Sequence, residues 1–446
     1  MSVPRLFIRV LTSSFALLLL VTATPPGGLA EKPPSDLGSE SVSGAAQLSD
    51  EIQVSPFVGP PDYDNYLPAV AYNSRHHQFL IVWHRLRSDG CREIWARRVT
   101  ESGQLLNNFM VSTGPCPENH MQPAVAYNAK DDNYLVAWMH NPSGTSLNDP
   151  NEILARTVAW DGSILGTKHQ AIAWANRSFW TPRVAWNSIR NEYMVVWNAI
   201  NTTTGLPNDI AHAILDHNGI RIVDSIIIDT LMSPHQVDVT WNVAMAEFFV
   251  VWRRMWTPGD GDIMGARLDQ DNGFIVSPPG VISISTLSND QQSPRVATNQ
   301  QHRYVVVWSQ VYDPSHCCDW DIHSQELDVY GSLVGGPMII VESLDDETMP
   351  VIAAQPGPTR NYLAAWRVTV TNSNAIRARY WDDMGTQSLV ISNVIFWDSS
   401  TPAVAMGGPG FLTTYTSDST SDPTVHRHVY MRFYVLYTTY LPVIKR

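Results

Sequence analysis

The stretch Pro123-Ala-Val-Ala-Tyr-Asn128, followed by Tyr134-Leu-Val-Ala-Trp138, is one copy of a unit that recurs along nearly the whole chain. The first half of the unit reads Pro-x-Val-Ala-Tyr/Trp-Asn. Its copies begin at Pro68, Pro123, Pro182, Val237, Pro294, Pro350 and Pro402. Subtraction gives spacings of 55, 59, 55, 57, 56 and 52 residues. A sustained period of this length is the signature of a repeat architecture, so the repeat decides the fold.

The second half of the unit ends in an aromatic residue and leads into hairpin signals. The aromatic residue lies 14 to 16 residues after its anchor in six copies: Trp83, Trp138, Trp197, Trp252, Trp308 and Trp366. Turn dipeptides such as Asp161-Gly162 and Asn218-Gly219 follow. Each copy therefore predicts four short strands, named a to d, which are separated by turns. Because the Trp recurs at one place, we expect it in the core rather than on a sugar-stacking surface.

Four-stranded antiparallel units repeated around an axis form the blades of a propeller. The sequence thus predicts an all-β fold, a seven-bladed β-propeller over residues 51–434. The last copy supplies strands a, b and c but no clear strand d. Glu51-Ile-Gln-Val-Ser55 is similar to Asn108-Phe-Met-Val-Ser112, the d strand before the second anchor. We therefore expect the N-terminal strand to complete the last blade and close the ring, which removes exposed sheet edges.

The N-terminal segment of the chain predicts export. Residues 1–30 have the pattern of a secretory signal, with Arg5 and Arg9 before an apolar run and cleavage near residue 23 or 30. A retained anchor is the alternative. Residues 31–50 are expected to be a flexible linker and residues 435–446 a C-terminal tail. No later segment has the apolar length of a transmembrane helix. We expect a secreted, periplasmic or cell-surface monomer.

Charge and cysteine content narrow the classes of partner and the redox environment. The formal charge is −13, and no stripe of basic residues is present, so nucleic acid is excluded as an expected partner. Four cysteines in an exported chain favour disulfides. Cys91 lies in a b–c loop and Cys116 in the d–a loop leaving the same blade, so a Cys91–Cys116 bridge is predicted. Cys317 and Cys318 are adjacent, and either bridge each other or remain thiols.

The b–c loops are long and differ from one another, whereas the a–b turns are short. Sequence-diverse loops on a rigid scaffold usually carry binding, so we expect a protein or a glycan to bind on the face formed by the b–c and d–a loops. The candidate binding residues on this face are Trp256, Tyr312, Asp319 and Trp320.

Two groups of residues suggest metals, although no cofactor is expected to be required. His316, Asp321 and His323 are candidate ligands for a transition metal, and a periplasmic metal or redox protein is the function they would imply. The alternative is that Asp321 only opens strand c, as equivalent acids do in other copies. Those acids suggest calcium or, alternatively, loop ordering through backbone N–H groups and strand-c arginines. They are Glu93, Glu152, Asp209, Asp262 and Asp321.

The repeat Pro-x-Val-Ala-Tyr-Asn…Tyr-Leu-Val-Val-Trp…Asp-Ile-x-Ala-Arg…Asp-Gly resembles repeats of bacterial exported propeller proteins of unassigned function. The resemblance covers about residues 51–434 and implies an architecture rather than an activity. No nucleophile elbow, phosphate-binding loop, HExxH or dinucleotide fingerprint is visible. The first hypothesis is a non-catalytic binding propeller. The alternative is a glycoside hydrolase or polysaccharide lyase, which would need acids from different blades to meet at the channel mouth.

Overall fold

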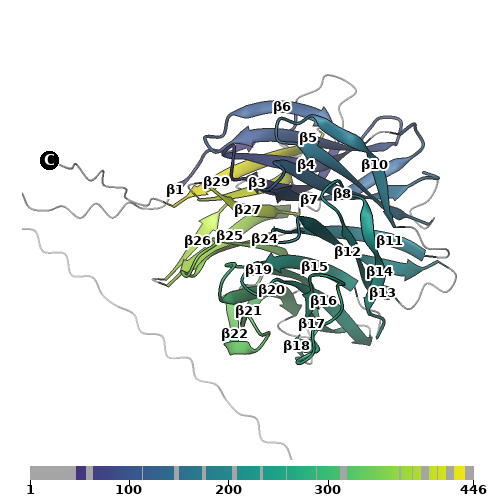
Figure 1. The fold of residues 1–446 in the computed structure, drawn as a ribbon. Helices are drawn as coiled ribbons and strands as arrows, with labels where there is room; N and C mark the ends of the chain where they lie inside the picture. The colour runs from purple at the N-terminus through teal and green to yellow at the C-terminus, as the bar shows by residue number, and fades with distance from the viewer. Residues whose placement is uncertain are drawn as a thin grey trace, which may run out of the picture. The chain divides into compact units, whose positions relative to one another are not determined.

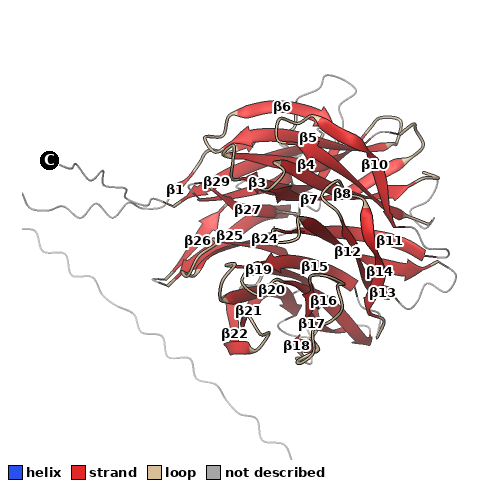
Figure 2. Ribbon diagram, in the orientation of Figure 1, coloured by secondary structure: helices blue, strands red, loops and turns tan. Residues whose placement is uncertain are grey.

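The computed structural model describes residues 47–56, 64–112, 114–144, 150–172, 177–202, 208–231, 235–257, 259–287, 289–311, 319–370, 373–383, 385–392, 401–408, 410–417 and 426–436. The predicted signal, most of the linker and most of the tail lie outside these residues. Within them every regular element is a β-strand and none is a helix, which confirms the all-β prediction (Figure 2). In the described part of the chain no helix is long and apolar enough to cross a membrane.

Four of the sheets contain four antiparallel strands each, in sequence order. Their strands are β11 (Arg177–Asn187), β12 (Glu192–Asn201), β13 (Asn208–Leu215) and β14 (Arg221–Asp229); β15 (His235–Asn242), β16 (Glu247–Thr257), β17 (Asp260–Asp269) and β18 (Val281–Ser285); β19 (Gln291–Thr298), β20 (Arg303–Val311), β21 (Trp320–Asp328) and β22 (Leu333–Val341); β23 (Asp346–Ala354), β24 (Asn361–Val370), β25 (Ser373–Asp382) and β26 (Thr386–Val390). We call each such group of four strands a unit.

The remaining strands form two further sheets. One holds β3 (Asp64–Asn73), β4 (Gln78–Leu86), β5 (Arg92–Thr100), β6 (Leu105–Met110), β7 (Asn119–Asn128), β8 (Asn133–Asn141), β9 (Glu152–Ala159) and β10 (Ile164–Ile172). The other holds β27 (Ala403–Gly407), β28 (Gly410–Ser417) and β29 (His428–Val435) together with β1 (Gln47–Leu48) and β2 (Ile52–Gln53) from the start of the chain. The first strand of the described residues therefore starts at Gln47, inside the stretch that the sequence assigns to the linker.

The eight-stranded sheet consists of two antiparallel four-stranded units joined at one point. Arg92 of β5 pairs in parallel with Asn119 of β7. The main-chain N–H of Arg92 also donates to the Asn119 side-chain oxygen at 3.0 Å. The four-stranded repeat expected from the sequence is thus preserved on both sides of this junction.

The repeat asparagine forms the turn between the first two strands of a unit. Its side-chain oxygen accepts main-chain N–H groups from the next residues; Asn128, for example, accepts from Lys130 at 2.8 Å and Asp131 at 3.0 Å. The same arrangement occurs at Asn73, Asn187 and Asn299. All four side chains are buried. An Asx turn of this kind explains why the a–b connections are short.

The core is divided into apolar clusters, and each cluster joins two neighbouring units. Among the described residues the repeat Trp of each of the first six copies is buried, and Trp138 is packed with residues of β4, β5 and β9. One cluster combines Val54 and Met431 with Trp83, so it joins the last strands to the first unit. Figure 1 likewise shows β27 and β29, in yellow, near β3. The first strands β3, β7, β11, β15, β19, β23 and β27 lie against one another in succession, and β27 also contacts β3.

The N-terminal strand makes the same contacts as the segment to which its sequence is similar. Val54 N–H donates to Val429 O at 2.6 Å, and Val429 N–H donates to Ser55 Oγ at 3.0 Å. In the β3–β6 unit, Val111 and Ser112 bond to Ile94 in the same way, at 2.8 and 2.9 Å. The similarity between residues 51–55 and 108–112 therefore extends to individual hydrogen bonds.

Candidate functional site

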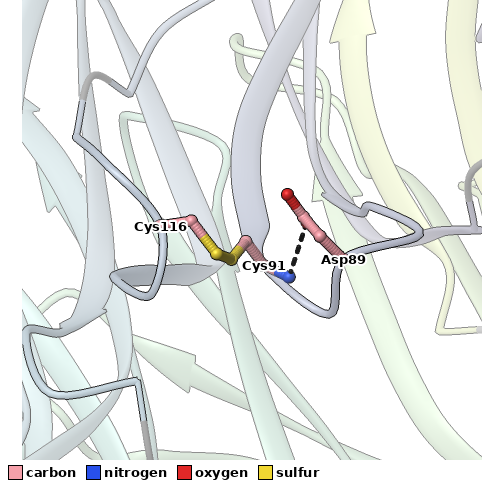
Figure 3. A group of neighbouring side chains, drawn as sticks. All are labelled: Asp89, Cys91 and Cys116. Atoms are coloured by element: carbon pink, nitrogen blue, oxygen red, sulfur yellow. Dashed lines mark hydrogen bonds between the residues drawn. A yellow bond between two sulfur atoms is a disulfide. The ribbon is translucent and has the colours of Figure 1, made fainter.

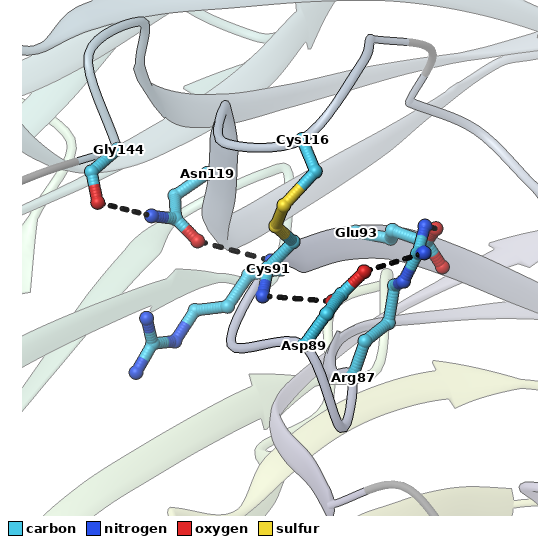
Figure 4. Close-up of a disulfide and its surroundings, with 8 residues drawn as sticks. Arg87, Asp89, Cys91, Glu93, Cys116, Asn119 and Gly144 are labelled. Carbon is cyan, nitrogen blue, oxygen red and sulfur yellow. Dashed lines mark hydrogen bonds and ion pairs between the residues drawn. A yellow bond between two sulfur atoms is a disulfide. The ribbon is translucent and has the colours of Figure 1, made fainter.

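A disulfide ties two loops together at one end of the β3–β6 unit. Cys91, in the loop between β4 and β5, is bonded to Cys116, which precedes β7, with their Cα atoms 5.8 Å apart (Figure 3). This confirms the predicted pairing and places a b–c loop beside a d–a loop. Asp89 accepts the Cys91 N–H at 3.2 Å and pairs with Arg87 at 2.7 Å (Figure 4). Asp89 lies close to both sulfurs, but two sulfurs bonded to each other offer no thiolate to a metal.

Two residues after this disulfide, Glu118 enters a cluster of basic side chains. Its Oε2 lies 3.2 Å from His140 Nε2, 3.6 Å from Lys168 Nζ and 3.7 Å from His120 Nε2. The other ring nitrogen of His140 lies 2.7 Å from Glu152. Two carboxylates thus bracket the His140 ring, and the Glu118 carboxylate fastens the disulfide-bonded loop to the β7–β10 unit. The sequence analysis did not identify this cluster.

Glu118, His120 and His140 bring ligand atoms close enough to hold a metal, but the proton on His120 opposes that role. The indole N–H of Trp138 donates to His120 Nδ1 at 2.9 Å. Trp83 donates in the same way to Asn65 at 2.7 Å, also 18 residues upstream. Burial lowers the pKa of His120 to about 3, so the ring is neutral. Since Nδ1 accepts a hydrogen bond, the single ring proton sits on Nε2, and that nitrogen has no lone pair for a metal.

The predicted binding residues are only partly described. Trp256 is 44% exposed; its indole N–H donates to Asp262, and the Arg254 guanidinium lies 5.9 Å from its ring centre. Asp319 and Trp320 are half-buried at the start of β21. Tyr312, together with Cys317 and Cys318, lies outside the described residues.

The predicted metal ligands Asp321 and His323 lie on β21, and His316 is outside the described residues. Asp321 Oδ1 accepts the Ser343 N–H at 3.2 Å, and burial raises the pKa of its carboxyl to about 6. The His323 ring stacks with Trp308 at 6.1 Å, and burial lowers its pKa. Among described residues no third His, Cys, Asp or Glu joins these two. Glu347, which the sequence analysis did not identify, is buried nearby with its pKa raised to about 7 by desolvation.

The other acids that open strand c mostly pair with residues outside that strand. Glu93 pairs with Arg85 at 2.8 Å and Arg87 at 2.9 Å, both from the end of the preceding strand and its loop. Asp209 pairs with Arg177 of β11 at 2.5 Å. The strand-c arginines bond elsewhere: Arg156, for example, donates to Val111 O at 2.8 Å. Asp321 orders its loop through a backbone N–H, as one of the two predicted modes requires. For Arg97, Arg156 and Arg267 the predicted pairing with these acids is replaced by other partners: Arg97 and Arg156 reach the neighbouring outer strand, and Arg267 pairs with Glu247.

A cavity of about 470 Å³ lies where the first strands of the units meet. In each unit the cavity is lined by the variable residue of the Pro-x-Val motif. These residues are Ala69, Ala124, Arg183, Asp238, Arg295, Val351 and Ala403. The residue before the anchor sits in a bulge with positive φ in six units, as at Gln122 (φ 53°) and Gln236 (φ 56°). Each of these glutamines accepts the N–H of the corresponding residue in the next unit, Thr181 at 2.8 Å and Ser293 at 2.7 Å, which braces the wall.

Three consecutive first strands place charge in this cavity. Asp238 Oδ1 lies 3.8 Å from Arg183 Nε, and its Oδ2 accepts the Val296 N–H at 3.0 Å. Arg183 and Arg295 each donate through Nη1 to the carbonyl of the preceding proline, at 3.0 and 2.8 Å. Burial and the neighbouring Arg183 lower the pKa of Arg295 to about 9. A guanidinium stays protonated in proteins, so both arginines carry a charge at neutral pH. The sequence carried a signal for this site, because position x is small or apolar in the other four copies.

The comparisons with known proteins concern the fold. No family model matches the chain, and no curated protein matches its sequence. A crystal structure of a protein of unknown function from Dyadobacter fermentans has a TM-score of 0.50 at 10% identity, covering 87% of this chain and 99% of that one. The β-propeller domain of the Trilobed protease from Pyrococcus furiosus has a TM-score of 0.47 at 9% identity, covering 82% and 95%. The Hadza microbial sialidase Hz136 has a TM-score of 0.46 at 12% identity, covering 67% and 63%. Four-stranded antiparallel units that meet through their first strands make this chain a β-propeller.

Proposed function

We propose that this protein is an exported, non-catalytic seven-bladed propeller that binds a protein or a glycan on the face formed by its b–c and d–a loops. The observation that carries the proposal is the Cys91–Cys116 disulfide, which fixes one loop of each kind side by side. A crosslink between two surface loops preorganises the face for a partner, and a disulfide is stable in the oxidising compartments to which export leads.

The proposed ring of seven blades is supported by the two ends of the described chain. β2 pairs with β29, through Ile52 with Met431 and Gln53 with Tyr430. Arg427, at the start of the last strand, donates its N–H to Asp64 of the first unit at 3.0 Å. In this proposal the N-terminal strand is the outer strand of the seventh blade, and closure leaves no first or last sheet edge free to associate with another chain.

The composition of the cavity favours binding over glycoside cleavage. Glycosidases of the usual kind need two carboxyl groups on either side of the scissile bond. Of the described residues that line the cavity, Asp238 is the only one with a carboxylate, and that carboxylate is engaged by Arg183 and by Val296 N–H. A hydrolase or lyase is therefore the second candidate, which the experiment below separates from the first.

The test is a thermal-shift screen of the mature protein, from about residue 31, against a polysaccharide panel, with each mixture assayed for reducing-end and unsaturated products. Binding to the native state raises the melting temperature. The matched variants are W256A, at the end of β16 next to the b–c connection, and Y330A, at a c–d turn; both side chains are exposed, by 44% and 61%. The expected result is a shift without product that W256A reduces and Y330A leaves unchanged.

Release of product would overturn the non-catalytic proposal in favour of the enzyme. A shift that Y330A reduces and W256A does not would place binding at the opposite end of the strands and refute the loop face. If no polysaccharide shifts the protein, the same two variants are compared in pull-downs from the cell envelope. Equal recovery of partners by both variants would then contradict the proposal.

A further inference from the structure

The charged side chains that line the central cavity do not neutralise one another. Its described lining contains two arginines and one aspartate, a net charge of +1, in a chain whose formal net charge is −13. The three charges come from successive first strands, β11, β15 and β19. The other units contribute alanine or valine at the same position. One wall of the cavity is therefore charged and the opposite wall is small and apolar.

The arginine side chains retain unused hydrogen-bond donors. A guanidinium has five N–H groups. Arg295 donates one of them to Pro294 O, and among the described residues no carboxylate lies within 4.0 Å of its nitrogens. Arg183 donates to Pro182 O and approaches Asp238 only at 3.8 Å. Its side chain keeps 26% of its surface accessible. Two charged guanidinium groups thus line the same cavity, and most of their N–H groups have no acceptor among the described residues.

The geometry points to a binding site for a small organic carboxylate. In this proposal Arg183 and Arg295 hold the carboxylate, and Asp238 accepts a hydrogen bond from a hydroxyl or ammonium group next to it. Planar guanidinium groups match the two oxygens of a carboxylate, and such charge-assisted bonds are strong in a buried site. A volume of about 470 Å³ lies in the range of small-molecule pockets. The alanine and valine wall suits the uncharged body of such a ligand.

The carboxylate of Asp238 determines which class of anion the cavity can bind. Its carboxylate lies on the same wall as the two arginines and would repel a doubly charged phosphate or sulfate. It is compatible with a singly charged acid whose neighbouring group donates a proton, as in a sugar acid, a hydroxy acid or an amino acid. This assignment does not depend on the loop-face proposal, because Arg183, Asp238 and Arg295 lie on first strands and not on the b–c or d–a loops.

The experiment measures binding to the full mature chain by calorimetry, with glucuronate and galacturonate as probes and glucose, galactose, sulfate and phosphate as comparisons. The variants are R183M, R295M and the double variant, with R190M as the control, since Arg190 lies on an a–b turn and is about half exposed. We expect a uronate to bind and its affinity to fall about tenfold or more with each cavity variant, while R190M is unchanged. R183K and R295K serve if the methionine variants do not fold; they keep the charge but lose the planar fork, so an intermediate loss is expected.

Equal binding of glucose or galactose would overturn the proposal, because no carboxylate would then be needed. Binding of sulfate or phosphate without either uronate would overturn the assignment of ligand class. Uronate binding that survives in the double variant, or no binding by any probe, would remove the site. W256A distinguishes this site from the loop face: loss of uronate binding in W256A but not in R183M would locate the carboxylate on the loops and overturn the cavity site.

Discussion

Arg97 donates its Nη1–H to the main-chain oxygen of Val54 at 2.8 Å, and Arg156 donates to Val111 in the same way at 2.8 Å. The two acceptors occupy matching positions in residues 51–55 and 108–112. Each arginine therefore bonds the outer strand of the neighbouring unit. The strand that Arg97 bonds comes from the N-terminus of the chain. It is hydrogen-bonded to β29, the last strand of the described residues.

This equivalence gives a matched test of ring closure. R97M and R156M should each lower the free energy of unfolding by on the order of 1 kcal/mol or more, because each leaves a buried carbonyl without a charged donor. Urea denaturation measures the free energy of unfolding of both variants. The control is R92M, because the bond to Asn119 is made by the main chain of Arg92 and not by its side chain. A neutral R97M beside a destabilising R156M would contradict the proposed role of residues 51–55.

Removal of the disulfide should destabilise the fold. The C91A/C116A variant opens a crosslink between residues 25 apart in sequence, and a native bridge of this kind contributes about 2–4 kcal/mol. Denaturant unfolding of the variant, compared with the oxidised and the chemically reduced parent, measures the loss. The reduced parent should match the variant; a variant as stable as the oxidised parent would show that the bridge places no constraint on the loops.

Substitution of His120 separates its structural role from metal binding. In the first unit the equivalent acceptor is the amide of Asn65, which accepts the Trp83 N–H. The variant H120N places an amide at the same position, so it should retain nearly the full stability. H120L leaves the buried Trp138 N–H without an acceptor and should cost about 1–3 kcal/mol. Thermal unfolding and metal analysis are made on both variants. Stoichiometric zinc in the parent that disappears in H120N would show that the tautomer assigned here is wrong.

The buried carboxyl of Glu347 predicts a pH dependence. Burial raises its pKa from 4.5 to about 7 in the folded chain, so between these pH values the native state holds a proton that the unfolded state has released. Stability from this group therefore falls as pH rises through that window. E347Q should be more stable than the parent at pH 7 and above, with the difference shrinking toward pH 4.5.

The contribution of Glu347 to stability is measured as the difference in melting temperature between E347Q and the parent across pH 4.5–8. Buried histidines act in the opposite sense: the pKa of His84 is lowered to about 3, so acid destabilises the native state through it. Because both proteins share His84, the difference isolates Glu347. D383N, at an exposed carboxyl, is the control and should leave the pH profile of the parent unchanged.

The sequence by itself determined the repeat, the strands and their order, and the Cys91–Cys116 pair. These features depend on interactions that are local along the chain. Where it is present, the repeat asparagine ends a first strand by accepting N–H groups two and three residues later, as at Asn128, and the alternation of apolar residues selects strands. The similarity of residues 51–55 to residues 108–112 also carried information, because equivalent positions in a repeat form equivalent hydrogen bonds.

Only the tertiary structure decided which residues meet. Arg183, Asp238 and Arg295 are 55 and 57 residues apart in sequence, and they share one cavity because the first strands of successive units lie side by side. Glu118 reaches His140 because it directly precedes β7, whose first residues pair with the end of β8. The strand-c residues Arg97 and Arg156 bond the neighbouring outer strand, which no period in the sequence could indicate. Contacts within a copy follow from local pattern, whereas contacts between copies depend on how the units pack.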